Sequence, residues 1–151
     1  MRAEGGVTLI EMLIVITIIS IMVGITFPAV TSGVDSLRLA SAADSTAAFL
    51  NSAMNRASRR QRVIEITISK PDGKLTARSS EAGYERVLAM PAGVKIKSVK
   101  PDIPHIYLYP GGAIPRMYVE LANARGARKT VSVDPITGVP DIRTPGEEEE
   151  K

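Results

Sequence analysis

Hydrophobic residues dominate the first part of the chain, where no charged side chain occurs between Glu11 and Asp35. As a helix, this segment of 23 residues would extend about 34 Å, slightly more than the roughly 30 Å hydrocarbon core of a bilayer. Many of its residues are β-branched, but its length and the need for internal backbone hydrogen bonding in lipid favour a helix. We therefore predict a membrane-spanning helix over residues 7–30. The alternative is a cleaved secretory signal ending near Thr31 and Gly33, although such signals have shorter apolar regions.

After residue 30 the pattern becomes that of an amphipathic helix, with apolar or small residues recurring every three or four positions. These residues are Leu37, Ala40, Ala43, Ala47, Leu50, Met54 and Ala57. The opposite face is expected to carry Asp35, Thr46, Arg56 and Arg60. Phe49 lies off the stripe, and we interpret it as core or rim packing, with a contact between helices in an assembly as the alternative. Residues 31–62 are thus predicted to continue the same helix and to lie against a folded domain.

Pro28 is the one proline of the long helix. It has no N–H group to donate to the carbonyl of Gly24, so the pair weakens the helix locally. We predict a kink or a melted turn at Gly24 and Pro28.

From residue 63 onward the hydrophobic period falls from 3.6 to 2, and turn residues recur at short intervals. The candidate strands are residues 62–69, 74–79, 84–90, 94–99, 106–109, 117–122 and 130–133. We predict an α+β fold in which the long N-terminal helix packs on a small antiparallel β domain, residues 63–143. Only 4% of the residues are aromatic and none is Trp, so the core should be thin and aliphatic and completed by the helix.

The composition excludes several kinds of chemistry. There is no Cys and only one His, His105, which excludes thiol nucleophiles, disulfides, Cys-based zinc sites and His-cluster metal sites. His105 has no neighbouring nucleophile motif, so we expect a structural or exposed histidine. Gly111 and Gly112 lack the context of a phosphate loop, and Asp134 alone provides too few carboxylates for calcium. We predict no cofactor, no metal and no enzymatic activity.

Glu11 is unusual because a carboxylate near the start of an apolar helix is costly in lipid, and points to a partner or to a side chain that reaches the interface. It belongs to the segment Gly-Gly-Val-Thr-Leu-Ile-Glu, residues 5–11. This segment resembles the processing site of type IV prepilins and type II secretion pseudopilins, in which a short leader is cut after a glycine and the new amino terminus is N-methylated. Pro28 falls at the twenty-second place of the remaining chain, where that family usually carries proline.

The resemblance implies a leader of residues 1–6, cleavage by prepilin peptidase between Gly6 and Val7, N-methylation of Val7, and a role for Glu11 in subunit assembly. The chain departs from the family in two places. Val7 replaces the usual phenylalanine or methionine, and the leader pairs its one basic residue, Arg2, with Glu4.

The rest of the chain resembles the H-type minor pseudopilins and the FimT-type minor pilins. The residues that carry this resemblance are 107–112 (Tyr-Leu-Tyr-Pro-Gly-Gly), 117–121, 125–126 and 131–138. In the DNA-binding members of the group, basic residues usually follow the glycine near the carboxyl end. Here Val139, Pro140 and Asp141 follow Gly138, so nucleic acid is not an expected partner.

The resemblance implies a minor pseudopilin of a type II secretion system, located at the tip of the periplasmic pseudopilus or at its initiation. Its implied partners are prepilin peptidase, the other major and minor pseudopilins, and the lipid of the inner membrane, with the leader in the cytoplasm and the β domain in the periplasm. One alternative is a minor pilin of a type IV pilus that takes part in DNA uptake. Another is a plain single-pass anchored periplasmic binding domain.

Charge is distributed unevenly along the chain. Residues 144–151 form an acidic tail that we expect to be disordered. Without residues 1–6 and 147–151, the chain carries 17 basic and 11 acidic side chains. The densest basic cluster is Arg56, Arg59, Arg60 and Arg62. We interpret it as complementing the dipole at the helix end, with an anionic partner as the alternative.

Overall fold

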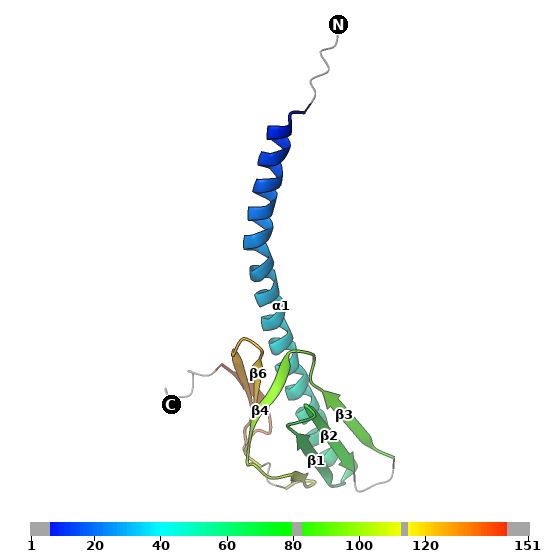
Figure 1. Cartoon of the computed structure of the whole chain (residues 1–151). Coiled ribbons are helices and arrows are strands. Elements are labelled where there is room, and N and C mark those ends of the chain that lie inside the picture. Colours follow the sequence, from blue (N-terminus) through cyan, green and yellow to red (C-terminus); the bar gives the residue numbers. More distant parts are fainter. Residues whose placement is uncertain (1–6, 80–82, 113–114, 145–151) are drawn as a thin grey trace. The chain divides into compact units, whose positions relative to one another are not determined.

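The computed structural model describes residues 7–79, 83–112 and 115–144, and it contains one long helix followed by β-strands (Figure 1). The helix α1 spans Leu9–Arg60. The chain divides into two compact units, Met1–Val34 and Asp35–Lys151. The predicted leader, residues 1–6, and residues 145–151 of the predicted acidic tail lie outside the described residues.

In the first unit, α1 satisfies the hydrogen bonds of its own hydroxyl groups. The Oγ1 of Thr17 donates to the carbonyl of Leu13 at 2.7 Å, and the Oγ of Ser20 donates to the carbonyl of Ile16 at 2.8 Å. A polar group that bonds within its own helix is tolerated in lipid at low cost. Thr17 and Ser20 are therefore compatible with a membrane span.

The melted turn that we predicted at Gly24 and Pro28 is absent, because α1 continues through both residues without interruption. A proline removes one backbone hydrogen bond of the helix, and the intact bonds of the adjacent turns keep the segment helical. A bend of the helix axis at this position stays a prediction. Nothing lies within 4 Å of the position that a Cβ atom on Gly24 would occupy.

In the second unit, α1 buries one face against the β-strands. The buried residues of this face are Leu39, Ala42, Ala43, Thr46, Phe49, Leu50, Ala53, Met54 and Ala57. The core position predicted for Phe49 is confirmed. Two predictions for this face were wrong, since Leu37 is 71% exposed and Thr46 is fully buried. Thr46 is tolerated inside because its hydroxyl donates to the carbonyl of Ala42 at 2.8 Å.

Eight strands form two antiparallel four-stranded sheets in the described part of the second unit. The first sheet has the order β3-β2-β1-β5, and the second has the order β4-β6-β7-β8. The strands are β1 (Ile64–Ser69), β2 (Lys74–Ser79), β3 (Glu85–Ala89), β4 (Val94–Lys100), β5 (His105–Leu108), β6 (Met117–Asn123), β7 (Arg128–Val133) and β8 (Pro140–Arg143). The prediction of a long helix packed on antiparallel strands is confirmed, with two sheets in place of one.

Strand β8 was not predicted. Proline and aspartate are poor strand formers, and they occupy its first two positions, Pro140 and Asp141. Proline is accepted because β8 is the edge strand of its sheet and Pro140 is its first residue, opposite Val133.

The core of the second unit is almost entirely aliphatic, as the composition predicted. The strand residues that join the buried helix face are Ile64, Ile66, Leu75, Ala77, Val94, Ile96, Val99, Ile106, Leu108, Met117, Val119, Leu121, Val131 and Val133. Phe49 is the only aromatic residue among the fully buried hydrophobic residues of the described chain. The helix supplies more than a third of this core, so the β-strands and the second half of α1 depend on each other for burial.

The end of α1 is closed by Gln61, a residue with a φ of 52°. The N–H of Arg62 donates to the carbonyl of Ala57 at 3.3 Å, which is the longer bond of a Schellman motif. The side-chain amide of Gln61 donates to the carbonyl of Ser58 at 2.7 Å. Two carbonyls of the last turn are thus satisfied by the chain that follows the helix.

Replacing Gln61 by glycine should stabilise the domain. Glycine avoids the cost of about 1–2 kcal/mol that a left-handed conformation imposes on other residues, and the lost side-chain bond offsets about 0.5–1 kcal/mol of that gain. We expect Gln61→Gly to raise the free energy of unfolding by about 0.5–1 kcal/mol, measured by urea denaturation of the full chain in detergent. Gln61→Ala loses the bond and keeps the strain, so it should destabilise. A glycine variant less stable than the alanine variant would contradict this account.

Candidate functional site

The first described residues of the chain lead directly into α1. Val7 is 61% exposed, and Thr8 caps the helix. The backbone N–H of Glu11 donates to the Oγ1 of Thr8 at 3.3 Å, and the N–H of Met12 donates to the carbonyl of Thr8 at 3.2 Å. Gly6, the other half of the predicted cleavage junction, lies outside the described residues. The helix therefore begins two residues after the predicted cut.

Thr8 and Glu11 have the spacing of a capping box, Thr-x-x-Glu, which our reading of the sequence overlooked. Glu11 lies in the first turn of α1, where the helix dipole favours a negative charge. Its carboxylate is exposed, and no ion-pair partner for it occurs in residues 7–79, 83–112 or 115–144. The helix start thus explains why an acid is tolerated at this position, and it leaves the carboxylate available to another molecule.

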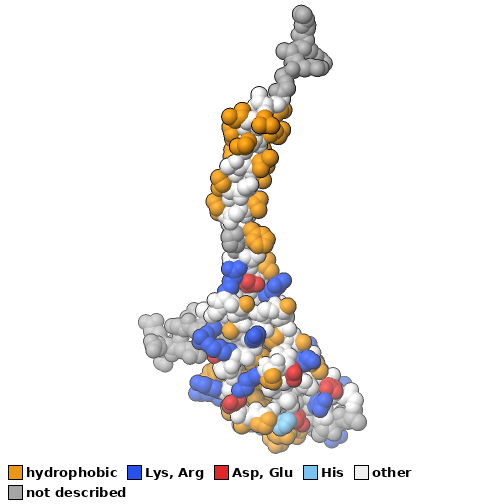
Figure 2. All heavy atoms as spheres, viewed as in Figure 1, with side chains coloured by type: hydrophobic (Ala, Val, Ile, Leu, Met, Phe, Trp, Pro, Cys, Tyr) orange, Lys and Arg blue, Asp and Glu red, His pale blue; other side chains and the backbone are white. Residues whose placement is uncertain are grey.

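None of the most apolar stretch of α1 is buried by the described residues, and Figure 2 shows hydrophobic side chains along the visible face of the helix. Its exposed large hydrophobic residues are Leu9, Ile10, Met12, Leu13, Ile14, Val15, Ile16, Ile18, Ile19, Ile21, Met22, Val23, Ile25, Phe27, Val30 and Val34. Burying each such side chain is worth about 1.5–3 kcal/mol. By length and composition, α1 is the one helix of the described residues that could cross a membrane. Such a surface requires an apolar environment.

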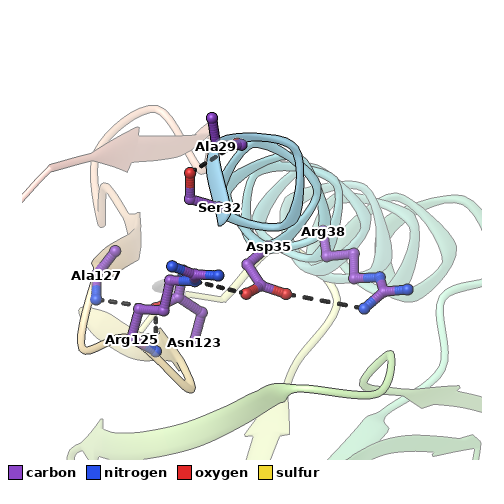
Figure 3. Close-up of polar contacts among 7 residues, drawn as sticks. All are labelled: Ala29, Ser32, Asp35, Arg38, Asn123, Arg125 and Ala127. Carbon is purple, nitrogen blue, oxygen red and sulfur yellow. Dashed lines mark hydrogen bonds and ion pairs between the residues drawn. The ribbon is translucent and has the colours of Figure 1, made fainter. Parts of the chain in front are cut away.

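The second unit begins at a polar junction between α1 and the hairpin that joins β6 to β7 (Figure 3). The Oδ2 of Asp35 accepts a hydrogen bond from the Nε of Arg125 at 2.9 Å, and its Oδ1 lies 3.8 Å from the Nη1 of Arg38. The Asp35 side chain is only 25% exposed. This ion pair joins residues 90 positions apart, and it fixes the hairpin against the first turn of the second unit.

Asn123 holds the hairpin in the shape that this junction needs. Its Oδ1 accepts hydrogen bonds from the backbone N–H groups of Arg125 at 3.1 Å and Ala127 at 2.9 Å, as Figure 3 shows. The N–H of Gly126 donates to the carbonyl of Asn123 at 3.1 Å. The segment was predicted as a turn, but neither the role of the Asn123 side chain nor the Asp35 contact was foreseen. Such long-range pairs leave no periodic signal in a sequence.

The polar residues that we considered for chemistry have ordinary surroundings. The Nδ1 of His105 lies 2.7 Å from the Oε1 of Glu65 and 3.2 Å from the Oγ1 of Thr67, on an exposed sheet surface. The Oδ1 of Asp134 accepts the N–H of Ile136 at 2.6 Å, which closes a turn. Three or more metal-binding side chains do not come together anywhere in the described part of the chain. His105 is exposed and is bonded to its neighbours across two strands.

Residues 1–27 match the family described as the prokaryotic N-terminal methylation motif. The chain therefore carries a prepilin-type processing motif. It spans the junction between Gly6 and Val7, the capped helix start and Glu11, and it ends one residue before Pro28. No curated protein sequence matches the chain.

The solved structures that resemble this chain are those of pilin-like proteins. The minor pseudopilin EpsH from the Type 2 Secretion System of Vibrio cholerae matches with a TM-score of 0.59 and 12% identity, over 72% of this chain and 98% of that one. The type IV minor pilin FimU of Pseudomonas aeruginosa matches with a TM-score of 0.55 and 18% identity, over 70% of this chain and 92% of that one. A second crystal form of FimU gives a TM-score of 0.52 at 18% identity, over 70% of this chain and 87% of that one.

The chain thus has a pilin-like fold, and the predicted resemblance to minor pseudopilins and minor pilins is confirmed at the level of motif and fold. The fold is shared by both groups and does not separate them. The individual roles predicted for Gly6, Val7, Glu11, Gly24 and Pro28 stay predictions.

Proposed function

We propose that the chain is a minor pseudopilin of a type II secretion system, a non-catalytic subunit of the periplasmic pseudopilus that drives protein export across the outer membrane. The observation that carries this proposal is that one chain has both the methylation motif and a fold that resembles EpsH over nearly all of the length of the EpsH chain. Prepilin peptidase cuts between Gly6 and Val7, and Val7 is then N-methylated. The mature chain begins one residue before the helix cap.

The apolar part of α1 has two environments in this scheme. Before assembly it crosses the inner membrane, and the β domain lies in the periplasm. During assembly the same exposed side chains leave lipid and pack against the helices of other major and minor pseudopilins. Both environments are apolar, so the transfer costs little hydrophobic free energy. The Glu11 carboxylate, which has no partner in the described chain, meets the amino terminus of a neighbouring subunit.

A minor pilin of a type IV pilus is the second candidate, because FimU resembles the chain at a similar TM-score and a higher identity. The DNA-uptake role that accompanied this candidate has less support. After Gly138 the chain forms β8, which opens with Pro140 and Asp141 in place of the basic residues of the DNA-binding members. A plain anchored binding domain would have no use for a processing motif.

Deleting the gene in its native host distinguishes these functions. We expect the deletion to abolish secretion of folded proteins into the medium, and to leave pilus-dependent twitching and DNA uptake unchanged. Complementation with the intact gene should restore secretion. Loss of twitching with normal secretion would replace our proposal by the minor-pilin function. Normal secretion, twitching and DNA uptake would point to an anchored binding domain.

A further inference from the structure

The last two turns of α1 present a row of arginines around an open hollow. Arg56, Arg59 and Arg60 line it together with Ser52 and Asn55, and its volume is about 350 Å³. Positions three and four residues apart lie on the same side of a helix, one turn from each other. The hollow is therefore a strip of guanidinium groups with polar side chains between them, on the surface of the second unit.

The positive charges of this strip are not neutralised by the described chain. Seven ion pairs occur among the described residues, and none contains Arg56, Arg59 or Arg60. The guanidinium of Arg56 lies 3.7 Å from the centre of the Tyr84 ring, a contact that orients the side chain and leaves its charge in place. Most other arginines of the second unit have a carboxylate partner, as Arg78 and Arg128 do. Three like charges on the last two turns of one helix favour an anionic partner.

The helix end explains the arginines only in part. Cations are favoured near a helix C-terminus, each by about 0.3–1 kcal/mol. Direct capping of the last carbonyls is not their role here, because the N–H of Arg62 and the side chain of Gln61 already bond to the carbonyls of Ala57 and Ser58. The guanidinium N–H groups therefore remain available to a ligand.

A run of carboxylates matches this strip in charge and in spacing. Guanidinium and carboxylate groups form paired, charge-assisted hydrogen bonds. In an extended peptide, alternate side chains on one side lie about 6.5–7 Å apart, close to the roughly 5.4 Å between successive helix turns. The chain itself contains such a run, Glu147 to Glu150. We propose that the arginine strip of one copy binds the glutamate run of a second copy.

The second copy is favoured over the same chain by where β8 ends. Arg143, the last residue of β8, pairs with Thr130, close to the hairpin whose Arg125 contacts Asp35. Asp35 and Arg59 lie about 36 Å apart along α1. The end of β8 thus lies near the end of the second unit opposite the hollow, and Glu147 is only four residues, at most about 14 Å, from Arg143. A contact between the two ends of different copies is a head-to-tail contact, which can repeat along an assembly.

This contact goes beyond the proposed function. It requires only the second units of two copies, and neither the processing motif nor the apolar part of α1. A fluorescent synthetic peptide with the sequence of residues 144–151 tests it. The receptor is the full chain in detergent micelles with Glu147 to Glu150 replaced by Gln, so that no tail competes. We expect Arg59→Gln with Arg60→Gln to weaken peptide binding by about tenfold or more. The same peptide with four Gln residues should not bind.

Lys95 and Lys97 provide the matched control, since both are exposed on β4 and have no ion-pair partner among the described residues. Their double Gln variant loses the same two charges and should weaken binding less than about threefold. Circular dichroism checks that both double variants keep the wild-type melting temperature. Sedimentation measures self-association of the full chain. We expect it to be weaker in the Arg59→Gln and Arg60→Gln double variant than in the wild type, and weaker also when Glu147 to Glu150 are replaced by Gln.

Three results would overturn the proposal. Equal weakening in the two double variants would mean attraction by net charge alone. A DNA duplex that binds more tightly than the peptide, with the same dependence on Arg59 and Arg60, would make the strip a nucleic-acid site. The third result is that the peptide binds but self-association does not change in the arginine variants or with the neutral tail. The contact would then form within one chain.

Discussion

Replacing Gly6 by leucine should abolish processing of the chain. In the proposed function, prepilin peptidase cuts after Gly6 and leaves a 145-residue product that begins with N-methylated Val7. A glycine before the cut has no side chain, so the peptidase can approach the backbone closely, and a bulky residue prevents that approach. Insertion into the membrane depends on the apolar part of α1, which this substitution leaves unchanged. Intact-mass spectrometry of the membrane-extracted protein measures the result.

Gly24→Ala is the matched control for this experiment. It also replaces a glycine, and the added methyl group meets nothing within 4 Å in the described chain. The control should be cut and methylated like the wild type. A wild-type chain that retains Met1 after extraction would contradict the processing prediction and the pseudopilin function with it.

Local patterns predicted most of the fold correctly. The uncharged segment after Glu11 was expected to be helical, and α1 contains all of it. Seven of the eight strands were located to within a few residues, and β2, Lys74–Ser79, matches its predicted bounds. Period-2 alternation between turn residues is a strong signal when one face of each strand is buried. The processing motif could be recognised from the sequence because its residues are close together in the chain.

The errors arose where two patterns coexisted. Leu39, Ala42, Thr46 and Phe49 follow the same spacing of three and four residues as the predicted stripe that starts at Leu37. Counting Thr46 as polar left this second row out of the predicted face, although a threonine bonded to its own helix can be buried. Tertiary packing buried residues of both rows and left Leu37 exposed.

The functional contacts of the second unit were the least predictable features. The pair between Asp35 and Arg125 joins residues 90 positions apart, and only the fold brings them together. The capping box of Thr8 and Glu11 was different, because its Thr-x-x-Glu signal stood in the sequence. It was overlooked because Glu11 already had an explanation from the family.

Replacing Glu11 by alanine should prevent assembly and spare both insertion and cleavage. In the proposed function its carboxylate pairs with the amino-terminal ammonium of a neighbouring subunit, in surroundings of low dielectric. Removing one member of such a buried pair costs about 3–5 kcal/mol, because it leaves the other charge without a partner. Incorporation of the variant into the pseudopilus should therefore fall by about a hundredfold or more. Crosslinking of the variant to other pseudopilins in membranes, followed by quantitative blotting, measures incorporation.

The structure supplies a competing role that this experiment must separate. Glu11 stabilises the helix start through the dipole, an effect of about 0.3–1 kcal/mol, and a variant that lost only this term would still assemble. The Thr8 cap survives Glu11→Ala, because Thr8 bonds to the backbone N–H of residue 11. Glu11→Gln keeps the size of the side chain and removes its charge, so it should fail like the alanine variant. Thr17→Ala removes a hydroxyl that bonds within the helix and should assemble normally. Normal incorporation of both Glu11 variants would reduce Glu11 to a helix-start residue and refute its pairing role.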